Sequence, residues 1–337
     1  MSDFKKIVEP LLKWYEAERR ILPWREDPQP YHVWVSEIML QQTRVEAVIE
    51  YYHRFLARFP DVSSLAAADL DEVLSYWQGL GYYRRCEMLY KAAKVVNDDY
   101  GGVLPCDHDA ILALPGVGRY TAAAIMSIGF GEPYPAVDGN VLRVIMRVTD
   151  RDDCIDEEKV KRKIETELAE IMPKDHASAF TQGLMDLGAT ICLPNGEPKC
   201  DICPWTHFCA GKYRAGILPV RKEKKPRKSE DRTVFLLLLG DKVAVRKRPE
   251  KGLLAKMWEF PNDSGILTSN EVLMAYDGHV RDLGKATHIF SHIEWHMQGY
   301  VVELQTKPND ETLVWAKKEE IADYAIPSAF SFIKKVL

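Results

Sequence analysis

The sequence predicts a multidomain protein in which an all-α domain precedes a smaller α/β domain. At 337 residues the chain is long enough to form two packed cores. Up to about residue 210, apolar residues recur at steps of three and four, which is the period of an amphipathic helix. Beyond residue 231 the pattern changes to short β-branched and aromatic runs bounded by Gly, Asp and Asn. We therefore expect domains at 1–212 and 232–337, joined by a linker at 213–231.

Helical periodicity is clearest at the start of the first domain. Positions 35, 38, 39, 42, 45 and 49 are Val, Ile, Met, Gln, Val and Ile, which together form one face of a long helix. Similar patterns predict helices over 84–97, 119–130, 157–171 and 176–189. In the second domain, RTVFLLLLG, KVAVRKR, HIFSHIEWHMQGYVVELQ and TLVWAKK predict strands. Helix-like segments occur there near 269–276 and 327–336.

Composition limits the classes of function. The formal net charge of −5 argues against a protein that coats nucleic acid by bulk attraction. Residues 211–232 hold nine Lys or Arg and three Asp or Glu, so this stretch is either a local basic face or a solvated linker. The first residues are charged and no apolar run approaches eighteen residues, so we expect no signal peptide, no membrane association and a cytoplasmic location, near the nucleoid in a bacterium.

A glycine-rich turn, LPGVGRY at 114–120, separates two predicted helices. We expect positive φ at Gly116 and Gly118, which would let the backbone approach an external group closely. The next helix is expected to begin near Arg119, where free backbone NH groups favour an anion such as phosphate. A plain connection between helices is the alternative.

Four of the seven cysteines, Cys192, Cys200, Cys203 and Cys209, lie in one short window. Seven, two and five residues separate them. In a reducing compartment such clustering favours a metal over disulfides. Structural zinc sites usually have two close pairs of ligands, and this window has one, so an iron-sulfur cluster is favoured while zinc stays open.

Several longer motifs resemble a known family. Together with the glycine turn and the cysteines, VDGNVLR (137–143) resembles the endonuclease III superfamily of helix-hairpin-helix DNA glycosylases. More narrowly, LPWR (22–25), VSEIMLQQTRV (35–45), GLGYYRR (79–85) and FSH (290–292) are similar to the MutY family of adenine DNA glycosylases. One difference is that the family usually has six residues between the first two cysteines, where this chain has seven.

The resemblance implies an all-α helix-hairpin-helix glycosylase domain with an iron-sulfur cluster loop, followed by an α/β Nudix-like domain. The implied activity is removal of adenine opposite 8-oxoguanine, and also opposite guanine or cytosine, by a monomer acting on double-stranded DNA. The implied cofactor is one [4Fe-4S] cluster on the four cysteines. The DNA backbone would be held by the hairpin residues Leu114, Gly116, Val117 and Gly118.

Two carboxylates are candidates for the chemistry. Glu37 lies among apolar residues of a predicted helix, where desolvation would keep a proton on it, so we interpret it as the general acid at adenine N7. The resemblance places an ionised Asp138 beside the sugar C1′, as a stabiliser or nucleophile, with Asn140 and Tyr120 orienting the site. The alternative for Asp138 is an ordinary helix N-cap. Members that also cut the strand carry lysine where this chain has Tyr120, which implies base removal alone.

The resemblance also implies a set of substrate-binding residues. Gln42 and Tyr82 would fill and wedge the base stack as the adenosine is flipped out. Arg20, Trp24 and Gln182 would line the base pocket. Phe290, Ser291 and His292 would inspect 8-oxoguanine. The simpler interpretations are that Trp24 is a core residue, that Gln42 is a surface amide and that Arg20 pairs with a neighbouring carboxylate. The set comprises Arg20, Trp24, Arg25, Gln42, Thr43, Tyr82, Gln182, Phe290, Ser291 and His292.

The second domain is predicted to bind rather than to catalyse. A Nudix hydrolase needs several closely spaced glutamates for magnesium, and the stretch NDSGILTSNEVLMAYDGHVRDLG has a single one, Glu271. Three alternatives to the leading hypothesis are a glycosylase with lyase activity, a non-enzymatic iron-sulfur DNA-binding protein and a nucleotide pyrophosphatase. Tyr120 argues against the first, the paired carboxylates against the second and the missing magnesium ligands against the third.

Overall fold

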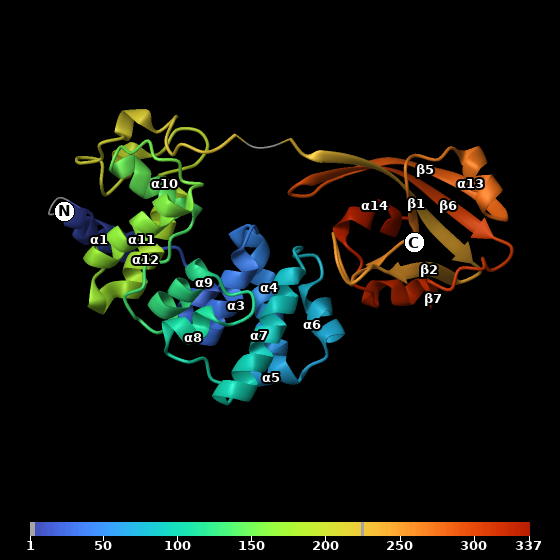
Figure 1. Ribbon diagram of the computed structural model, residues 1–337, viewed down its shortest axis with the longest axis horizontal. Helices are drawn as coiled ribbons and strands as arrows, with labels where there is room; N and C mark the ends of the chain where they lie inside the picture. The colour runs from blue at the N-terminus through green and yellow to red at the C-terminus, as the bar shows by residue number, and fades with distance from the viewer. Residues whose placement is uncertain (1–3, 224–225) are drawn as a thin grey trace. The chain divides into compact units, whose positions relative to one another are not determined.

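The computed structural model describes residues 4–223 and 226–337 and divides into two compact units (Figure 1). Of the described residues, 4–68 and 84–223 form the first unit, and 69–83 and 226–337 form the second. Within the described ranges, no helix is both long and apolar enough to cross a membrane.

All regular elements described in the first unit are helical, as the sequence predicts. The expected helices at 84–97 and 157–171 are α7 (Arg84–Tyr100) and α11 (Glu158–Ile171). The remaining α-helices are α1 (Val8–Glu18), α2 (Pro23–Glu26), α3 (Pro30–Leu40), α4 (Val45–Arg58), α5 (Val62–Ala67), α8 (His108–Leu112), α9 (Arg119–Ala124), α10 (Gly139–Val148) and α12 (Ala177–Asp186). Short 3₁₀ turns are η1 (Phe4–Ile7), η3 (Lys174–His176), η5 (Cys200–Ile202) and η6 (Lys212–Arg214).

Two predicted helices end in a π-helical turn. The helix expected at 119–130 is α9 continued by η2 (Ile125–Gly129), and that expected at 176–189 is α12 continued by η4 (Leu187–Ile191). Such wider turns interrupt α-helices mostly at functional sites. One residue of each turn, Ile128 and Ala189, lines the same cavity described below.

The core of the first unit forms around α10. Every residue from Val141 to Val148 is buried in that helix. Its apolar side chains pack with those of α11 and α12 and with the N-terminal Ile7 and Leu11. The indole NH of Trp205, from the cysteine-containing loop, donates to the carbonyl of Ile7 at 3.0 Å. The two ends of this unit therefore share one core.

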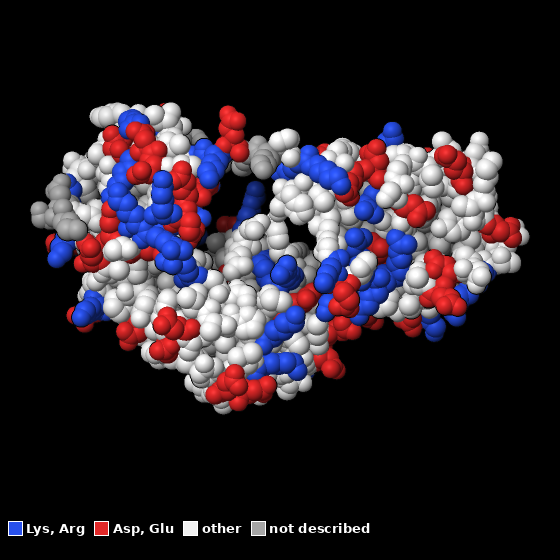
Figure 2. All heavy atoms as spheres, viewed as in Figure 1, with Lys and Arg blue, Asp and Glu red and all other residues white. Residues whose placement is uncertain are grey.

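On the face shown in Figure 2, basic and acidic side chains lie next to one another over α11. At its start Lys159 pairs with Glu157 at 2.9 Å and Arg162 with Glu158 at 3.9 Å. Neighbouring charges of opposite sign offset each other in solution. This helix is therefore not a uniformly basic surface.

The second unit is built on a mixed seven-stranded sheet, in agreement with the predicted α/β domain. The strand order is β3-β2-β1-β6-β5, with β4 paired to β1 and β7 to β2. β1 and β6 run parallel, and the other pairs are antiparallel. The strands are β1 (Lys228–Leu239), β2 (Lys242–Lys247), β3 (Trp258–Glu259), β4 (Asn262–Ser264), β5 (Gly278–Ile289), β6 (Ile293–Leu304) and β7 (Leu313–Lys317).

Helices cover both faces of this sheet. The predicted segment near 269–276 is α13 (Ser269–Ala275), whose Val272 packs with Phe235 and Tyr300 on one face. The segment near 327–336 contains η8 (Ser328–Phe330) and α14 (Ser331–Lys334), which pack with η7 (Lys318–Asp323) on the other. α6 (Leu70–Trp77) lies in residues 69–83, the segment of this unit that precedes the sheet in sequence.

The first strand begins earlier than the expected linker end. β1 starts at Lys228, inside the range 213–231, because residues 228–238 pair in parallel with β6 from Ile293 onward. Ladder hydrogen bonds form along the backbone whatever the side-chain charge, so the basic composition of this stretch hides its strand.

Candidate active site

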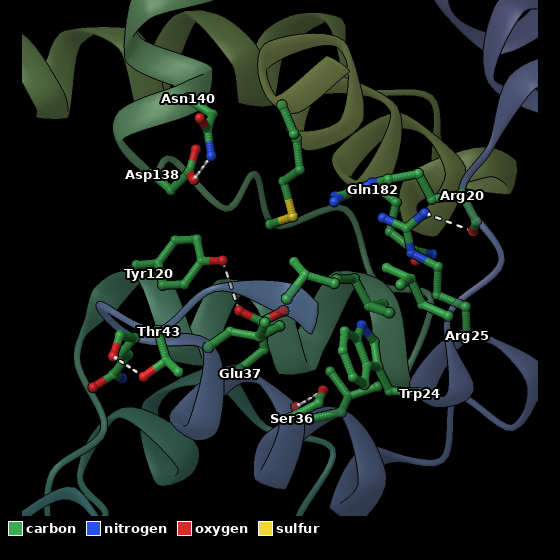
Figure 3. A pocket seen from close by; sticks show the side chains of 18 of the residues that line it. Arg20, Trp24, Arg25, Ser36, Glu37, Thr43, Tyr120, Asp138, Asn140 and Gln182 are labelled. Atoms are coloured by element: carbon green, nitrogen blue, oxygen red, sulfur yellow. Dashed lines mark hydrogen bonds between the residues drawn. The ribbon is translucent and has the colours of Figure 1, made fainter. Parts of the chain in front are cut away.

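A cavity of about 330 Å³ in the first unit brings together residues from α2, α3, α9, α10 and α12 (Figure 3). That volume lies in the range of small-molecule sites. It contains most of the predicted catalytic and base-pocket residues, although they span more than 160 positions of sequence. These are Arg20, Trp24, Arg25, Glu37, Gln42, Thr43, Tyr120, Asp138, Asn140 and Gln182.

Glu37 is the buried acid of the cavity. Its side chain comes from α3, is 5% exposed, and accepts a hydrogen bond from the Tyr120 hydroxyl at 2.6 Å. Burial raises the pKa of Glu37 to about 7, the Tyr120 hydrogen bond opposes that rise, the Asp138 carboxylate adds to it, and Arg25 opposes it. Near neutral pH a substantial fraction of Glu37 therefore carries a proton.

Asp138 both caps α10 and lines the cavity. Its Oδ1 accepts from the backbone NH of Val141 and its Oδ2 from Asn140 Nδ2, both at 2.7 Å. Burial raises the pKa of Asp138, while the hydrogen bonds from Val141 and Asn140 and the charge of Arg143 act against that rise. The N-cap interpretation is thus confirmed, and it leaves the carboxylate inside the cavity.

Arg143 connects this carboxylate to the cysteine-containing loop. Its Nη2 donates to Asn140 Oδ1 at 2.9 Å and to the Gly188 carbonyl at 2.7 Å. Its Nε donates to the Cys192 carbonyl at 2.8 Å. The orientation of Asn140, and through it that of Asp138, therefore depends on where residues 188–192 lie.

The other end of the cavity holds two arginines bound by one carboxylate. Asp186, on α12, accepts from Arg20 Nε at 2.7 Å and from Arg25 Nη1 and Nη2 at 2.6 and 2.8 Å. The interpretation of Arg20 as paired with a neighbouring carboxylate is thus confirmed. Asp186 was not predicted, although it follows Gln182 by four residues, the spacing that places side chains on one helix face.

Trp24 and Gln182 form further walls of the cavity. Trp24 is 6% exposed and packs edge-on against Tyr52, with ring centroids 5.4 Å apart. Gln182 donates to Ser178 Oγ at 3.0 Å. Trp24 is therefore a core residue and a wall of the cavity at once.

Gln42 and Tyr82 share an unusual backbone conformation. Gln42 has φ 58° and Tyr82 has φ 49°, the left-handed region that non-glycine residues occupy rarely and at a cost. Gln42 follows α3, where Arg85 Nη1 donates to the carbonyls of Ile38 and Met39, each at 2.8 Å. Thr43 Oγ1 accepts from Arg85 Nη2 at 3.1 Å. Arg85 thus fixes the turn that carries Gln42.

Tyr82 is 47% exposed and is not among the residues that line the cavity.

The glycine turn has the predicted form at one of its two glycines. Gly116 has φ 75°, and a Cβ there would lie 2.4 Å from Cβ of Met88. α9 begins at Arg119, as expected. The prediction of positive φ at Gly118 was wrong: this residue has φ −97° and ψ 173° because it is the extended N-cap of α9. Its Cβ position is open, with no heavy atom within 4 Å.

The four cysteines line one small cavity of about 30 Å³. Burial, with the neighbouring thiolates adding, raises the pKa of Cys203 to about 12. Arg147 Nη1 donates to Cys192 Sγ at 3.3 Å and to the carbonyl of Leu193 at 2.8 Å. In residues 4–223 and 226–337, no three His, Cys, Asp or Glu side chains converge on a point where one metal ion would bind. A four-iron cluster needs no such point, because each thiolate binds a different iron, so the donor set fits a cluster.

In the second unit the residues Phe290, Ser291 and His292 form the turn between β5 and β6. Phe290 packs edge-on against Trp295, with centroids 4.9 Å apart, and its NH donates to the Ile293 carbonyl at 2.8 Å. The Ser291 and His292 side chains are both exposed and lie on a turn that the contacts of Phe290 hold in place.

Glu271, the single glutamate of the stretch 262–284, has a structural role in the second unit. Its carboxylate accepts from the NH of Thr268 at 2.7 Å in a capping box at the start of α13. It is therefore engaged at a helix end, away from any group of acidic side chains in the described residues.

Comparisons with known proteins agree with this architecture. Residues 35–174 match the family model of the HhH-GPD superfamily base excision DNA repair proteins, and residues 233–335 match that of the NUDIX domain. The helical unit and its cavity therefore define a base excision repair enzyme. A thermostable thymine-DNA glycosylase of known structure superimposes with a TM-score of 0.58 at 31% identity, covering 63% of this chain and 98% of that chain.

Proteins that align with nearly the whole chain identify the family more narrowly. The adenine DNA glycosylase of Buchnera aphidicola subsp. Schizaphis graminum is 33% identical, over 97% of this chain and 96% of its own. The human adenine DNA glycosylase is 32% identical, over 97% of this chain and 73% of its own. The chain belongs to the adenine DNA glycosylase family.

Proposed function

We propose that this protein removes adenine paired with 8-oxoguanine, and also with guanine or cytosine, by hydrolysing the bond between base and deoxyribose. One observation carries the proposal: Glu37, a buried carboxylic acid whose pKa is raised to about 7, shares a cavity with the hydrogen-bonded carboxylate of Asp138. Pairs of carboxyl groups with such different environments are typical of glycoside cleavage.

The two groups divide the chemistry. Adenine leaves poorly as an anion, so Glu37 gives its proton to N7 as the base departs. The electrons of the glycosidic bond leave with the base and positive charge grows on the sugar. The ionised Asp138, held by Val141 and Asn140, stabilises that charge until water adds at C1′. The water proton passes to a carboxylate of the pair.

Tyr120 supports base removal without strand cleavage. It stands where strand-cutting members of the superfamily carry lysine, and its hydroxyl is bound to Glu37. A phenol cannot form an imine with the sugar. Cleavage of the abasic strand is therefore left to another activity.

The base reaches the cavity by leaving the duplex. Breaking the bond inside a stacked helix is sterically blocked, so the adenosine flips out. We assign the space it leaves to Gln42 and Tyr82, and contacts with the flipped base to Arg20, Trp24 and Gln182. The backbone is held at the glycine turn, where the open side of Gly118 allows close approach.

We assign inspection of the opposite base to the second unit. The Ser291 and His292 side chains can hydrogen-bond the edge of 8-oxoguanine, and Phe290 packs beside it. In this proposal residues 1–212 carry the glycosylase activity, 213–231 link the domains and 232–337 supply recognition. The protein acts as a monomer on DNA.

We infer that Cys192, Cys200, Cys203 and Cys209 hold one [4Fe-4S] cluster. When bound, the cluster cross-links residues 192–209, a loop with one short 3₁₀ turn and few buried apolar side chains. Arg147 fixes the same loop from α10 through Cys192 and Leu193. The cluster therefore has a structural role in this proposal.

A labelled duplex with one adenine opposite 8-oxoguanine, incubated with excess protein, tests the proposal. We expect strand breaks only after hot alkali, and none with Glu37→Gln. Breaks without alkali would contradict the assignment of Tyr120, whereas no breaks under either condition would contradict the substrate. Duplexes with adenine opposite guanine, cytosine and thymine complete the comparison.

A further inference from the structure

Asp186 is a buried anion between two cations. Its side chain is 1% exposed, and the side chains of Arg20 and Arg25 beside it are 28% and 9% exposed. Besides the guanidinium contacts, Asp186 Oδ2 accepts from the backbone NH of Arg20 at 3.2 Å. Arg25 Nη1 also donates to the Arg20 carbonyl at 3.2 Å. This network fixes the segment between α1 and α2 against α12.

One of these cations acts on the general acid. The charged and titratable groups that line the cavity with Glu37 are Tyr120 from α9, Asp138 from the start of α10, Arg25 from α2 and Arg20, which precedes α2. Of the two cations, Arg25 lowers the pKa of Glu37. The Arg25 cation favours the ionised form of Glu37, which cannot donate a proton. Charges interact more strongly in a buried site than in bulk water, and Glu37, Arg25 and Asp186 are all buried. The Asp186 carboxylate, which offsets the charge of Arg25, therefore also changes the electrostatic potential at Glu37.

We propose that Asp186 is a positioning residue that neutralises Arg25 and so lets Glu37 keep the proton it gives to the base. The proposal rests on the function proposed above. Burial raises the pKa of Asp186, but the hydrogen bonds and charges of Arg25 and Arg20 outweigh burial and bring this pKa below its ordinary value. Asp186 therefore stays ionised. Its charge is thus constant over the pH range in which Glu37 titrates.

Removing this anion changes the charge that Glu37 meets. With Asp186→Asn, two guanidinium groups remain in the pocket with no carboxylate to bind them, and Glu37 becomes an anionic partner for Arg25. Ionisation of Glu37 then costs less, so its proton is lost at lower pH. The amide also weakens the fork-shaped contact that orients Arg25.

The test is the pH dependence of adenine release in a single turnover, with the full chain in saturating excess over an adenine:8-oxoguanine duplex. We expect the rate for the unchanged protein to fall as pH rises through about 7. For Asp186→Asn we expect this alkaline limb to move down by about one pH unit, so that the rate at pH 8 drops roughly tenfold. At the acid end the difference should shrink to a few-fold.

Two further variants separate charge balance from structural damage. Asp186→Glu restores the charge and should return the limb toward that of the unchanged protein. Arg25→Met removes the cation and should move the limb up, whatever its effect on the maximal rate. Glu167→Gln makes a matched change at another arginine-paired carboxylate, 2.7 Å from Arg151, and should not move the limb.

The outcomes distinguish this inference from the proposed function. If Glu37→Gln releases adenine normally, the proposed function fails. If Glu37→Gln is inactive but the limb of Asp186→Asn and that of Arg25→Met stay where they are, only the role of Asp186 is overturned. Should Asp186→Asn unfold, as thermal unfolding would reveal, the upward shift expected for Arg25→Met still decides the question.

Discussion

The hydroxyl of Tyr120 donates a hydrogen bond of 2.6 Å to Oε2 of Glu37. Burial raises the pKa of Tyr120, with the charges of Glu37 and Asp138 adding, so the phenol keeps its proton and remains the donor. A donor stabilises the ionised carboxylate, so this bond lowers the pKa of Glu37 against the effect of burial. Tyr120 thus moderates how tightly Glu37 holds its proton.

Replacing Tyr120 with phenylalanine should therefore shift the pH profile upward. Without the donor the pKa of Glu37 rises further, so the alkaline limb of single-turnover adenine release should move above that of the unchanged protein. This direction is opposite to the one expected for Asp186→Asn. A limb that stays in place or moves down would show that this hydrogen bond does not set the proton affinity of Glu37.

Glu37 should also make folding stability depend on pH. Its pKa is raised from an ordinary 4.5 to about 7 in the folded protein. The folded state binds more protons between these values, so the contribution of Glu37 is neutral below about 4.5 and becomes destabilising as pH rises to about 7. Above pH 7 the full effect is on the order of 3 kcal/mol.

The measurement is thermal or denaturant unfolding of Glu37→Gln at pH 5 and pH 8.5. We expect the variant to be more stable than the unchanged protein at pH 8.5, by on the order of 2 to 3 kcal/mol, with a much smaller difference at pH 5. The exposed Glu46→Gln is the control and should show no such pattern. Equal stability of the two proteins at both pH values would mean that Glu37 ionises freely.

Most residues of this cavity could be named from the sequence, chiefly through the resemblance of its motifs to a known family. Apolar neighbours in a helix single out Glu37 as a buried acid, whereas Tyr120 and Asp138 were selected by that resemblance, and all three line one cavity. Asp186 was missed because an aspartate in a helix gives no sign that its partners lie more than 160 positions away. The conformation of Gly118 was mispredicted because a glycine in a turn and a glycine at an N-cap look alike in sequence.

The fold was predictable to a similar degree. The helices at 84–97, 119–130, 157–171 and 176–189 were located because their apolar residues recur at steps of three and four. The long helix expected across 35–49 was wrong: α3 ends at Leu40 and α4 begins at Val45, because Gln42 between them has a positive φ that no α-helix accommodates. β1 was expected four residues later than it begins, because the residues 228–231 that extend it are charged or polar. The parallel pairing of β1 with β6 depends on contacts between distant segments, which local composition does not encode.

The two glycines of the turn should respond differently to alanine. Gly116→Ala adds a Cβ 2.4 Å from that of Met88 at a φ that disfavours it, so we expect a loss of about 1 to 3 kcal/mol of stability. Gly118→Ala adds a methyl group in open space and should leave stability within about 0.5 kcal/mol.

The affinity for a DNA duplex, measured by fluorescence anisotropy at fixed salt, should also distinguish Gly118→Ala from the unchanged protein. Gly118→Ala should weaken binding several-fold, because its methyl group occupies the space through which a phosphate would approach. A stable Gly118→Ala protein with unchanged affinity would place the backbone contact elsewhere.

The cysteine loop makes a chemical prediction. Purified protein should contain about four irons and four sulfides and absorb in the visible range. Cys203→Ser should lose iron and destabilise residues 192–209, seen as faster amide exchange there. Cys106→Ser, at an exposed cysteine outside the loop, is the control. One zinc per chain in place of iron would overturn the assignment of the cluster.

The shared core of the two ends of the first unit has a consequence during synthesis on the ribosome. α1 is translated long before its partners in that core, α12 and Trp205. The apolar face of α1 in the nascent chain therefore stays exposed while most of the unit is translated. Chaperones that bind such faces would act on this chain early.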